Sequence, residues 1–238
     1  MKLCQYLLAC MTLCLLFVLA ACTSSSPSSS PGQQAADTTQ PTFTTPQQAA
    51  QQGKQDLLDI LRMHPETALG ITDTGLLSRS APGQPIPQEV LDFQQLLTTD
   101  SAVSFSQFRR EQAHTLVPLM ADGRLVTIVT LARENDQWKV SALAGKAMSD
   151  DLQVVLQAAS RYMRTGEPVR ISLVEVPNLQ ARLFVVEVND TEMVFTPYNG
   201  FSLREAVPVT AVVRVLHRDA VEFQKQYGDQ LKRARLTE

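Results

Sequence analysis

Every cysteine of this 238-residue chain lies within its first 22 residues, at positions 4, 10, 14 and 22. Everything after Cys22 must therefore fold without a disulfide, a thiolate metal site or a cysteine nucleophile. A domain without disulfides or metal cross-links is stabilised by its apolar core alone. The remaining length of chain is sufficient to form such a core.

The first 21 residues have the order of features of a secretory signal peptide. Lys2 supplies a positive charge, residues 3–18 are almost uninterrupted apolar sequence, and the small residues Ala20 and Ala21 follow. The apolar stretch is also close to the length of a membrane-spanning helix, so an uncleaved anchor remains an alternative. We expect residues 1–21 to be a cleaved signal peptide.

The end of this segment, Leu19-Ala20-Ala21-Cys22, resembles the lipobox of bacterial lipoproteins. The resemblance covers only the start of the chain. It implies cleavage before Cys22, a diacylglycerol on the Cys22 sulfur and a further acyl chain, such as palmitate, on the new amino terminus. Stable anchoring takes about two acyl chains. The expected location is the cell membrane or the outer membrane, with the rest of the chain facing outside the cytoplasm.

The composition changes abruptly after Cys22. Serine, proline, glutamine, threonine and alanine dominate, and Phe43 is the only large apolar residue before about Gln52. Such a segment buries too little apolar surface to offset the entropy of ordering it. We therefore interpret residues 22–52 as a lipidated cysteine followed by a disordered tether, and residues 53–238 as the globular domain.

The charge balance excludes one class of partner. The formal net charge is −3, and loss of Lys2 with the signal peptide would make it −4. A nucleic-acid-binding domain carries a basic bias, and this chain has none. No nucleic-acid partner is expected.

Periodicity and turn residues predict the elements of the globular domain. Apolar spacing predicts helices at 54–63 and 87–97, a helix capped by Ser149 and ending near 165, and a closing helix at 219–233. Alternation and β-branched residues predict strands, separated by turns such as Asp122-Gly123 and Asn189-Asp190, at 114–120, 124–132, 138–143, 168–176, 181–188, 192–198 and 207–216.

Short turns between strands favour antiparallel pairing over crossover helices. The fold class expected is α+β, with antiparallel meander sheets and flanking helices. Residues 116–129 and 173–186 are faintly similar to each other, which leaves open whether the domain consists of two related helix-plus-sheet halves.

The residues that carry chemistry do not form a known motif. His64, His114 and His217 have no metal-ligand spacing, and the common hydrolase and nucleotide-binding signatures are missing. Asp150 and Asp151 are better explained by the positive end of a helix than by glycoside hydrolysis. We expect no catalytic residue, no metal and no cofactor.

Two groups of side chains are candidate recognition surfaces. Tyr198 and Phe201 flank Asn199-Gly200, a turn that would present both rings as a binding tip. Arg161, Arg164 and Arg170 form a candidate cationic patch near a helix end. The alternatives without a binding role are that the two rings fold back onto the sheet, and that the arginines interact favourably with the helix C-terminus.

The sequence thus predicts a lipid-anchored envelope protein with a non-enzymatic binding or scaffold role. Its partner would be an envelope protein, the cell wall or a membrane complex. Two other classes stay open: an envelope hydrolase with a dispersed active site, and a carrier or chaperone for an apolar ligand. A polar cleft, an apolar cavity or an exposed apolar patch would distinguish the three.

Overall fold

The computed structural model describes residues 40–235, apart from residues 68, 103 and 163–168. Its helices are α1 (Pro46–Met63), α2 (Thr74–Arg79), α3 (Phe93–Thr98), α4 (Lys146–Ala159) and α5 (Val209–Arg235), with two short 3-10 helices, η1 (Pro177–Leu179) and η2 (Tyr198–Gly200). Its strands are β1 (Ala81–Pro82), β2 (Ile86–Leu91), β3 (Arg109–Ala121), β4 (Arg124–Glu134), β5 (Gln137–Leu143), β6 (Arg170–Val176), β7 (Ala181–Val188), β8 (Thr191–Phe195) and β9 (Val207–Pro208).

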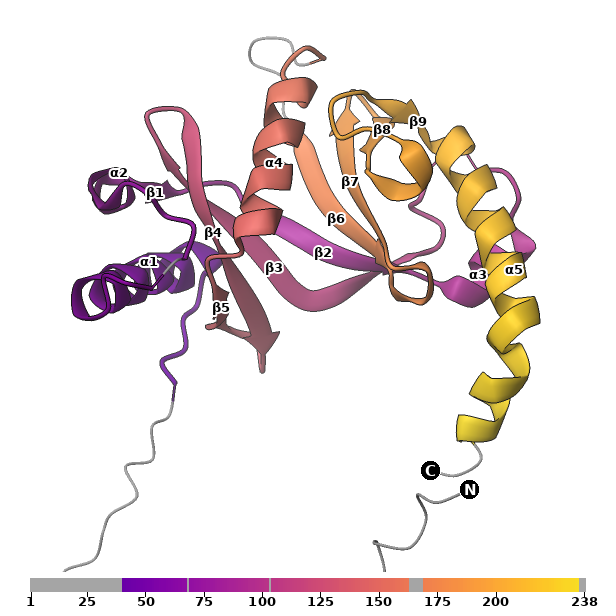
Figure 1. The fold of residues 1–238 in the computed structure, drawn as a ribbon, viewed down its shortest axis with the longest axis horizontal. Helices are drawn as coiled ribbons and strands as arrows, with labels where there is room; N and C mark the ends of the chain where they lie inside the picture. Colours follow the sequence, from indigo (N-terminus) through magenta and orange to yellow (C-terminus); the bar gives the residue numbers. More distant parts are fainter. Residues whose placement is uncertain (1–39, 68, 103, 163–168, 236–238) are drawn as a thin grey trace, which may run out of the picture. The chain divides into compact units, whose positions relative to one another are not determined.

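The strands form one sheet in the order β5-β4-β3-β2-β6-β7-β8-β9, and β1 pairs with β3 (Figure 1). All of these pairs are antiparallel except β2 with β6, which is parallel. The fold is therefore α+β, as expected. The parallel pair joins two three-stranded meanders, β3-β4-β5 and β6-β7-β8, through the single strand β2.

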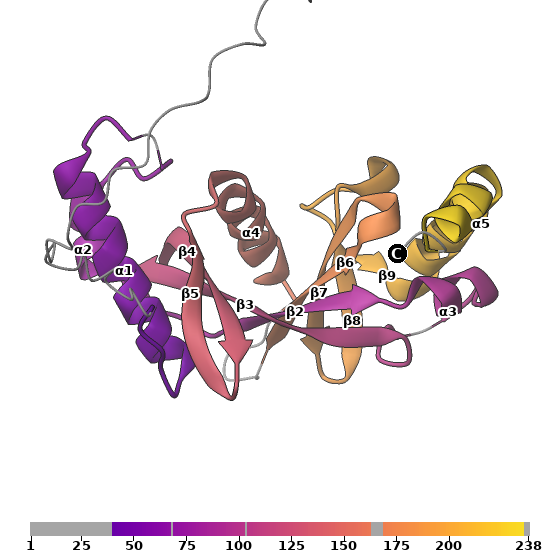
Figure 2. The same ribbon diagram turned by 90° about the horizontal axis from the view of Figure 1, so that it is seen from below.

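Alternate residues of the strands pack against different helices, because successive side chains of a strand point to opposite faces. Leu116 of β3 and Leu173 of β6 pack under α4. Their neighbours face the other way: Val117 packs with α1 and α2, and Val174 packs with α3 and α5. Helix α4 thus covers one face at the centre, and the opposite face is covered only toward its two ends (Figure 2).

Three hairpin turns follow the predicted chemistry. Asp122-Gly123, Asn135-Asp136 and Asn189-Asp190 all have positive φ at both turn residues, between 49° and 71°. Two positive φ values in succession define the turn whose twist matches antiparallel strands, and Asn, Asp and Gly tolerate them best. These turns fix the meanders locally.

The ordered domain begins earlier than predicted. Thr45 caps α1 with its side chain, Pro46 opens the helix, and α1 runs from there to Met63, so residues 46–52 belong to the domain and not to the tether. Ahead of the helix, Phe43 and Trp138 exchange two backbone hydrogen bonds of 2.8 and 2.7 Å at the edge strand β5. The glutamine-rich composition of residues 46–52 did not predict this early start of the helix, because only one face of α1 packs on the sheet.

Two other predicted elements were wrong. Residues 207–216 were expected to form a strand, but α5 begins at Val209. Valines suggested a strand, yet Val209, Val212, Val213 and Leu216 recur at helical spacing and are all buried. The expected helix at 87–97 is β2 followed by α3, with Asp92 capping α3 through its side chain.

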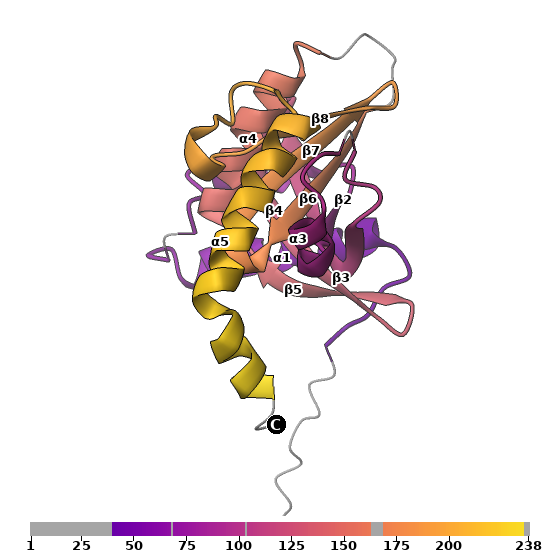
Figure 3. The ribbon, with the colours of Figure 1, turned by 90° about the vertical axis from the view of Figure 1, so that its right-hand side faces the viewer.

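Helix α5 runs beside α3 along the second meander (Figure 3). Among the described residues, no helix has the length and apolarity that a membrane crossing requires. The expected signal peptide, Cys22 and most of the expected tether lie outside the described residues.

Candidate functional site

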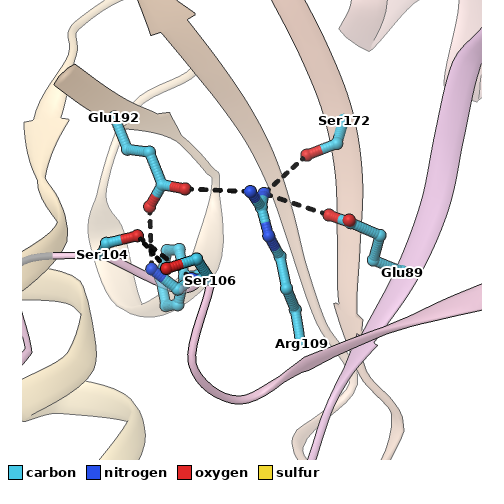
Figure 4. Close-up of polar contacts among 7 residues, drawn as sticks. Glu89, Ser104, Ser106, Arg109, Ser172 and Glu192 are labelled. Carbon is cyan, nitrogen blue, oxygen red and sulfur yellow. Dashed lines mark hydrogen bonds and ion pairs between the residues drawn. The ribbon is translucent and has the colours of Figure 1, made fainter. Parts of the chain in front are cut away.

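Arg109 connects three strands on the face that α4 leaves uncovered (Figure 4). It lies at the start of β3. Its Nη1 is 3.1 Å from Glu89 Oε2 on β2, and its Nη2 is 3.1 Å from Glu192 Oε1 on β8. One guanidinium therefore holds two carboxylates that are distant in sequence. We call these three residues the charge network, together with Ser172 on β6, which also accepts from Arg109.

The charge network is shielded from solvent. The exposed fractions of the side chains are 6% for Glu192, 16% for Glu89 and 19% for Arg109. Arg109 Nη1 also donates to Ser172 Oγ on β6 at 3.3 Å. Buried charges are tolerated where partners and further hydrogen bonds offset their desolvation, and these groups meet that condition.

Glu192 has a second donor of its own. The backbone N–H of Phe105 donates to Glu192 Oε2 at 2.7 Å. The Phe105 side chain is fully buried and makes an edge contact with Phe108, with ring centroids 5.7 Å apart. Next to it, Ser104 Oγ accepts from the Ser106 N–H at 3.1 Å, which fixes the turn (Figure 4). The apolar core thereby positions the N–H that completes the network.

A hollow of about 320 Å³ opens beside the charge network. It is lined by Gln84, Pro85, Pro87, Glu89, Arg109, Arg170, Ile171, Ser172, Val185 and Glu187. Arg170 and Glu187 face each other across β6 and β7 in the strand register. Neither side chain has an ion-pair or hydrogen-bond partner among the described residues. They are the charged groups that this hollow offers to a ligand.

Both carboxylates of the charge network accept from the same guanidinium, Glu89 through Oε2 and Glu192 through Oε1. Three members of the network, Glu89, Arg109 and Ser172, line the hollow. They are held by one another, whereas the exposed Arg170 and the half-buried Glu187 are free to contact a ligand.

A second hollow, of about 590 Å³, is lined by residues that flank η1 and η2. Tyr198, a member of the expected binding tip, lines it and donates its hydroxyl proton to Asp219 Oδ2 on α5 at 2.8 Å. Burial raises the pKa of Tyr198 above its usual value, and the hydrogen bond to Asp219 and the negative charge of that carboxylate raise it further.

The expected binding tip is only in part a tip. Asn199 and Gly200 have the positive φ values predicted for the turn, 51° and 83°. Tyr198 and Phe201 are nevertheless half-buried, and both pack against the core of the second meander. Tyr198 remains available as a wall of the second hollow, and Phe201 is not among the residues that line it.

The expected cationic patch is divided by the structure. Arg170 begins β6 and lines the first hollow, whereas Arg161 lies exposed in the turn after α4 and is not among the lining residues. Arg164 lies outside the described residues, as does Cys22. Of the two arginines that the structure describes, only Arg170 lines a candidate site.

The histidines lie apart from both hollows. His64 Nδ1 is 3.4 Å from Glu66 in an exposed pair, and His114 is exposed on β3. His217 Nδ1 is 2.9 Å from the carbonyl oxygen of Leu96 in α3, where it joins two helices. Within the described residues, no cluster of three histidine, cysteine or acidic side chains could hold a metal ion.

The sequence pattern did not indicate the charge network. Glu89 lies 20 residues before Arg109, and Glu192 lies on a strand of the other meander. One signal was present: Glu192 alternates with the fully buried Val194, so its side chain had to point to a packed face. An inward-pointing carboxylate requires a partner, but the sequence cannot show that the partner is Arg109.

No family model, curated protein or solved structure matches this chain.

Proposed function

We propose that this protein is a lipid-anchored extracytoplasmic envelope protein, and that its domain binds a partner without catalysing a reaction. The observation that carries the binding role is the first hollow. Three members of the charge network, Glu89, Arg109 and Ser172, line it, and so do Arg170 and Glu187, whose charges have no partner among the described residues.

The fixed floor favours binding over hydrolysis. In the first hollow, Glu89 is held by Arg109, and Ser172 Oγ accepts from the same guanidinium. Glu187 is the lining carboxylate without a partner among the described residues, and glycoside hydrolysis would need a second free carboxyl group beside it. The polar lining also fits a carrier of apolar ligands poorly, because such sites are mainly apolar.

The anchor rests on the sequence Leu19-Ala20-Ala21-Cys22 and on the tether composition that follows it. The described structure begins at Gln40, and α1 begins at Pro46, so residues 46–52 belong to the domain and not to the expected tether.

The anchor is tested by intact mass and membrane partitioning of the native protein beside a Cys22→Ala variant. We expect the native protein to lose its first 21 residues, gain acyl mass and stay with the membrane. The variant should gain no acyl mass. If both proteins keep full-length mass and remain in the membrane, residues 3–21 form an anchor helix and the lipidation proposal is wrong.

The binding role is tested by site-directed photocrosslinking in cells. A photoreactive residue at position 84 would line the first hollow, and one at the exposed Arg124 would serve as the control position. We expect a discrete adduct from position 84, which Arg170→Glu abolishes and Arg161→Glu does not. Equal adducts from both positions, or none from position 84, would exclude the hollow as the binding site.

A further inference from the structure

The second hollow has a lining that differs from the first. Its walls include the rings of Pro177, Pro197 and Tyr198. They also include two carboxamides, those of Gln180 and Asn199. Apolar ring surfaces mixed with planar hydrogen-bonding groups suit a ligand that has both apolar faces and a dense set of hydroxyl groups.

The lining of the second hollow also carries one charge of each sign. Glu175 and Arg182 face each other in the register of β6 and β7. Glu175 has no hydrogen-bond or ion-pair partner among the described residues. Arg182 has a single long ion pair, 3.5 Å from Nη1 to Asp151 Oδ2, and its Nε–H has no acceptor. The pair adds hydrogen-bonding capacity without net charge, which favours a neutral ligand over an anion or a cation.

The walls are held in place before any ligand arrives. The fully buried Thr196 donates its hydroxyl to the Arg182 carbonyl at 2.6 Å and accepts from the Tyr198 N–H at 3.1 Å. The Tyr198 hydroxyl is fixed on Asp219, and Gln180 adopts a left-handed conformation that closes η1. A rigid wall lowers the entropy cost of binding, because fewer groups must be ordered on contact.

The geometry points to a saccharide site in the second hollow, one that takes a neutral oligosaccharide of pyranose units. A pyranose offers apolar C–H faces to proline and tyrosine rings, and hydroxyl groups to amide, guanidinium and carboxylate groups. The volume of about 590 Å³ lies within the range of about 300–1,000 Å³ that is usual for small-ligand sites. This site is separate from the first hollow, and it does not depend on the lipid anchor.

The test is saturation-transfer NMR on the full-length native protein, in a detergent without a sugar headgroup. The probes are tetramers of N-acetylglucosamine and of glucose, at up to about 10 mM. We expect at least one tetramer to bind, with the strongest saturation on ring C–H protons. Failure of both tetramers, or binding of a proline-rich peptide in their place, would overturn the inference.

Variants separate the site from the fold. Tyr198→Ala should weaken tetramer binding about tenfold or more, whereas Tyr198→Phe keeps the ring and should change it less than threefold. Because Tyr198→Ala removes a packed ring, Glu175→Ala is the second variant: Glu175 has no partner to lose, and the affinity should still fall. Glu187→Gln in the first hollow is the matched control. Equal binding by Glu175→Ala and Glu187→Gln would overturn the inference.

Discussion

The two meanders are built from the same local elements, but the helices that pack on them are held in different ways. Each has three antiparallel strands and is followed by a long helix, α4 after β5 and α5 after the second meander. On the first meander, α1 lies so close that a Cβ on Gly53 would be 2.7 Å from Val129 Cγ1. On the second, α5 is also held by side-chain hydrogen bonds, from Tyr198 to Asp219 and between His217 and the Leu96 carbonyl.

The difference shows two ways to position a helix on a sheet. Close packing fixes distance through shape, because a well-packed core resists even one additional methyl group. Hydrogen bonds fix orientation, because donor and acceptor must be aligned. The charge network belongs to neither meander alone: Arg109 of the first is held by Glu192 of the second. The first hollow lies beside this junction.

The largest effect is expected at the junction. Arg109→Ala would leave Glu192, with 6% of its side chain exposed, without its cation. Removal of one member of a buried ion pair costs about 3–5 kcal/mol. The measurement is the free energy of unfolding by urea denaturation. We expect one transition at a lower midpoint, because the two meanders share β2.

The control for this variant is Arg62→Ala, since Arg62 pairs with Asp59 and the two side chains are 72% and 42% exposed. An exposed pair contributes below about 1 kcal/mol. Equal losses for the two arginine variants would show that burial of the network has no energetic weight. Two separate transitions in Arg109→Ala would show that the meanders are independent units joined by the network.

The next largest effect is expected where close packing holds α1 on the first meander. Gly53→Ala would place a methyl group against Val129, and overpacking of this kind costs about 1–3 kcal/mol. The same substitution normally favours a helix by about 1 kcal/mol, so a net loss identifies the contact as its cause. Thermal unfolding measures it, with Gln51→Ala on the exposed side of α1 as the control. A stabilised Gly53→Ala protein would contradict the close approach of α1.

A smaller effect is expected where hydrogen bonds hold α5 on the second meander. Tyr198→Phe removes the bond to Asp219 and should lower the free energy of unfolding by about 1 kcal/mol at neutral pH. Because folding raises the pKa of Tyr198, the stabilisation is present below the usual tyrosine pKa of 10.0 and declines as pH rises above it.

The measurement is urea unfolding of the native protein and the variant between neutral pH and about pH 11. The native protein should lose more stability than Tyr198→Phe over the alkaline part of this range. Tyr227→Phe is the control, because 38% of Tyr227 is exposed. An identical alkaline loss in the native protein and Tyr198→Phe would show that the hydroxyl of Tyr198 is not buried on Asp219.

The comparison also explains which parts of the molecule the sequence could predict. Hairpin turns depend on two adjacent residues, so Asp122-Gly123 and Asn189-Asp190 located the meanders correctly. Helix α5 was only half predicted, because β-branched valines favour strands locally while their spacing of three and four residues favours a helix. In this segment, burial of the valines on one helix face outweighed their local preference for a strand.

The candidate site was much less predictable than the fold. Glu89, Arg109 and Glu192 meet only because β2 lies between the two meanders, and the parallel pairing of β2 with β6 leaves no local mark in the sequence. Tyr198 was found because an aromatic residue beside a left-handed turn is a local signal. The partners that line its hollow, Glu175 and Arg182, come from another hairpin and could not be inferred.

The smallest effect is expected in α4, which packs on both meanders and whose start was predicted wrongly. Ser149 was expected to be the N-cap, but Gly145 holds that position and the Ser149 N–H bonds to the Gly145 carbonyl at 2.8 Å inside the helix. The Ser149 hydroxyl is buried without a partner in the described structure. Ser149→Ala should therefore raise the free energy of unfolding by about 0.5–1 kcal/mol, because it removes an unsatisfied group and improves helix propensity. If Ser149 capped the helix, the same substitution would instead lower it by about 1 kcal/mol, so the sign measured by urea denaturation decides between the two starts of α4.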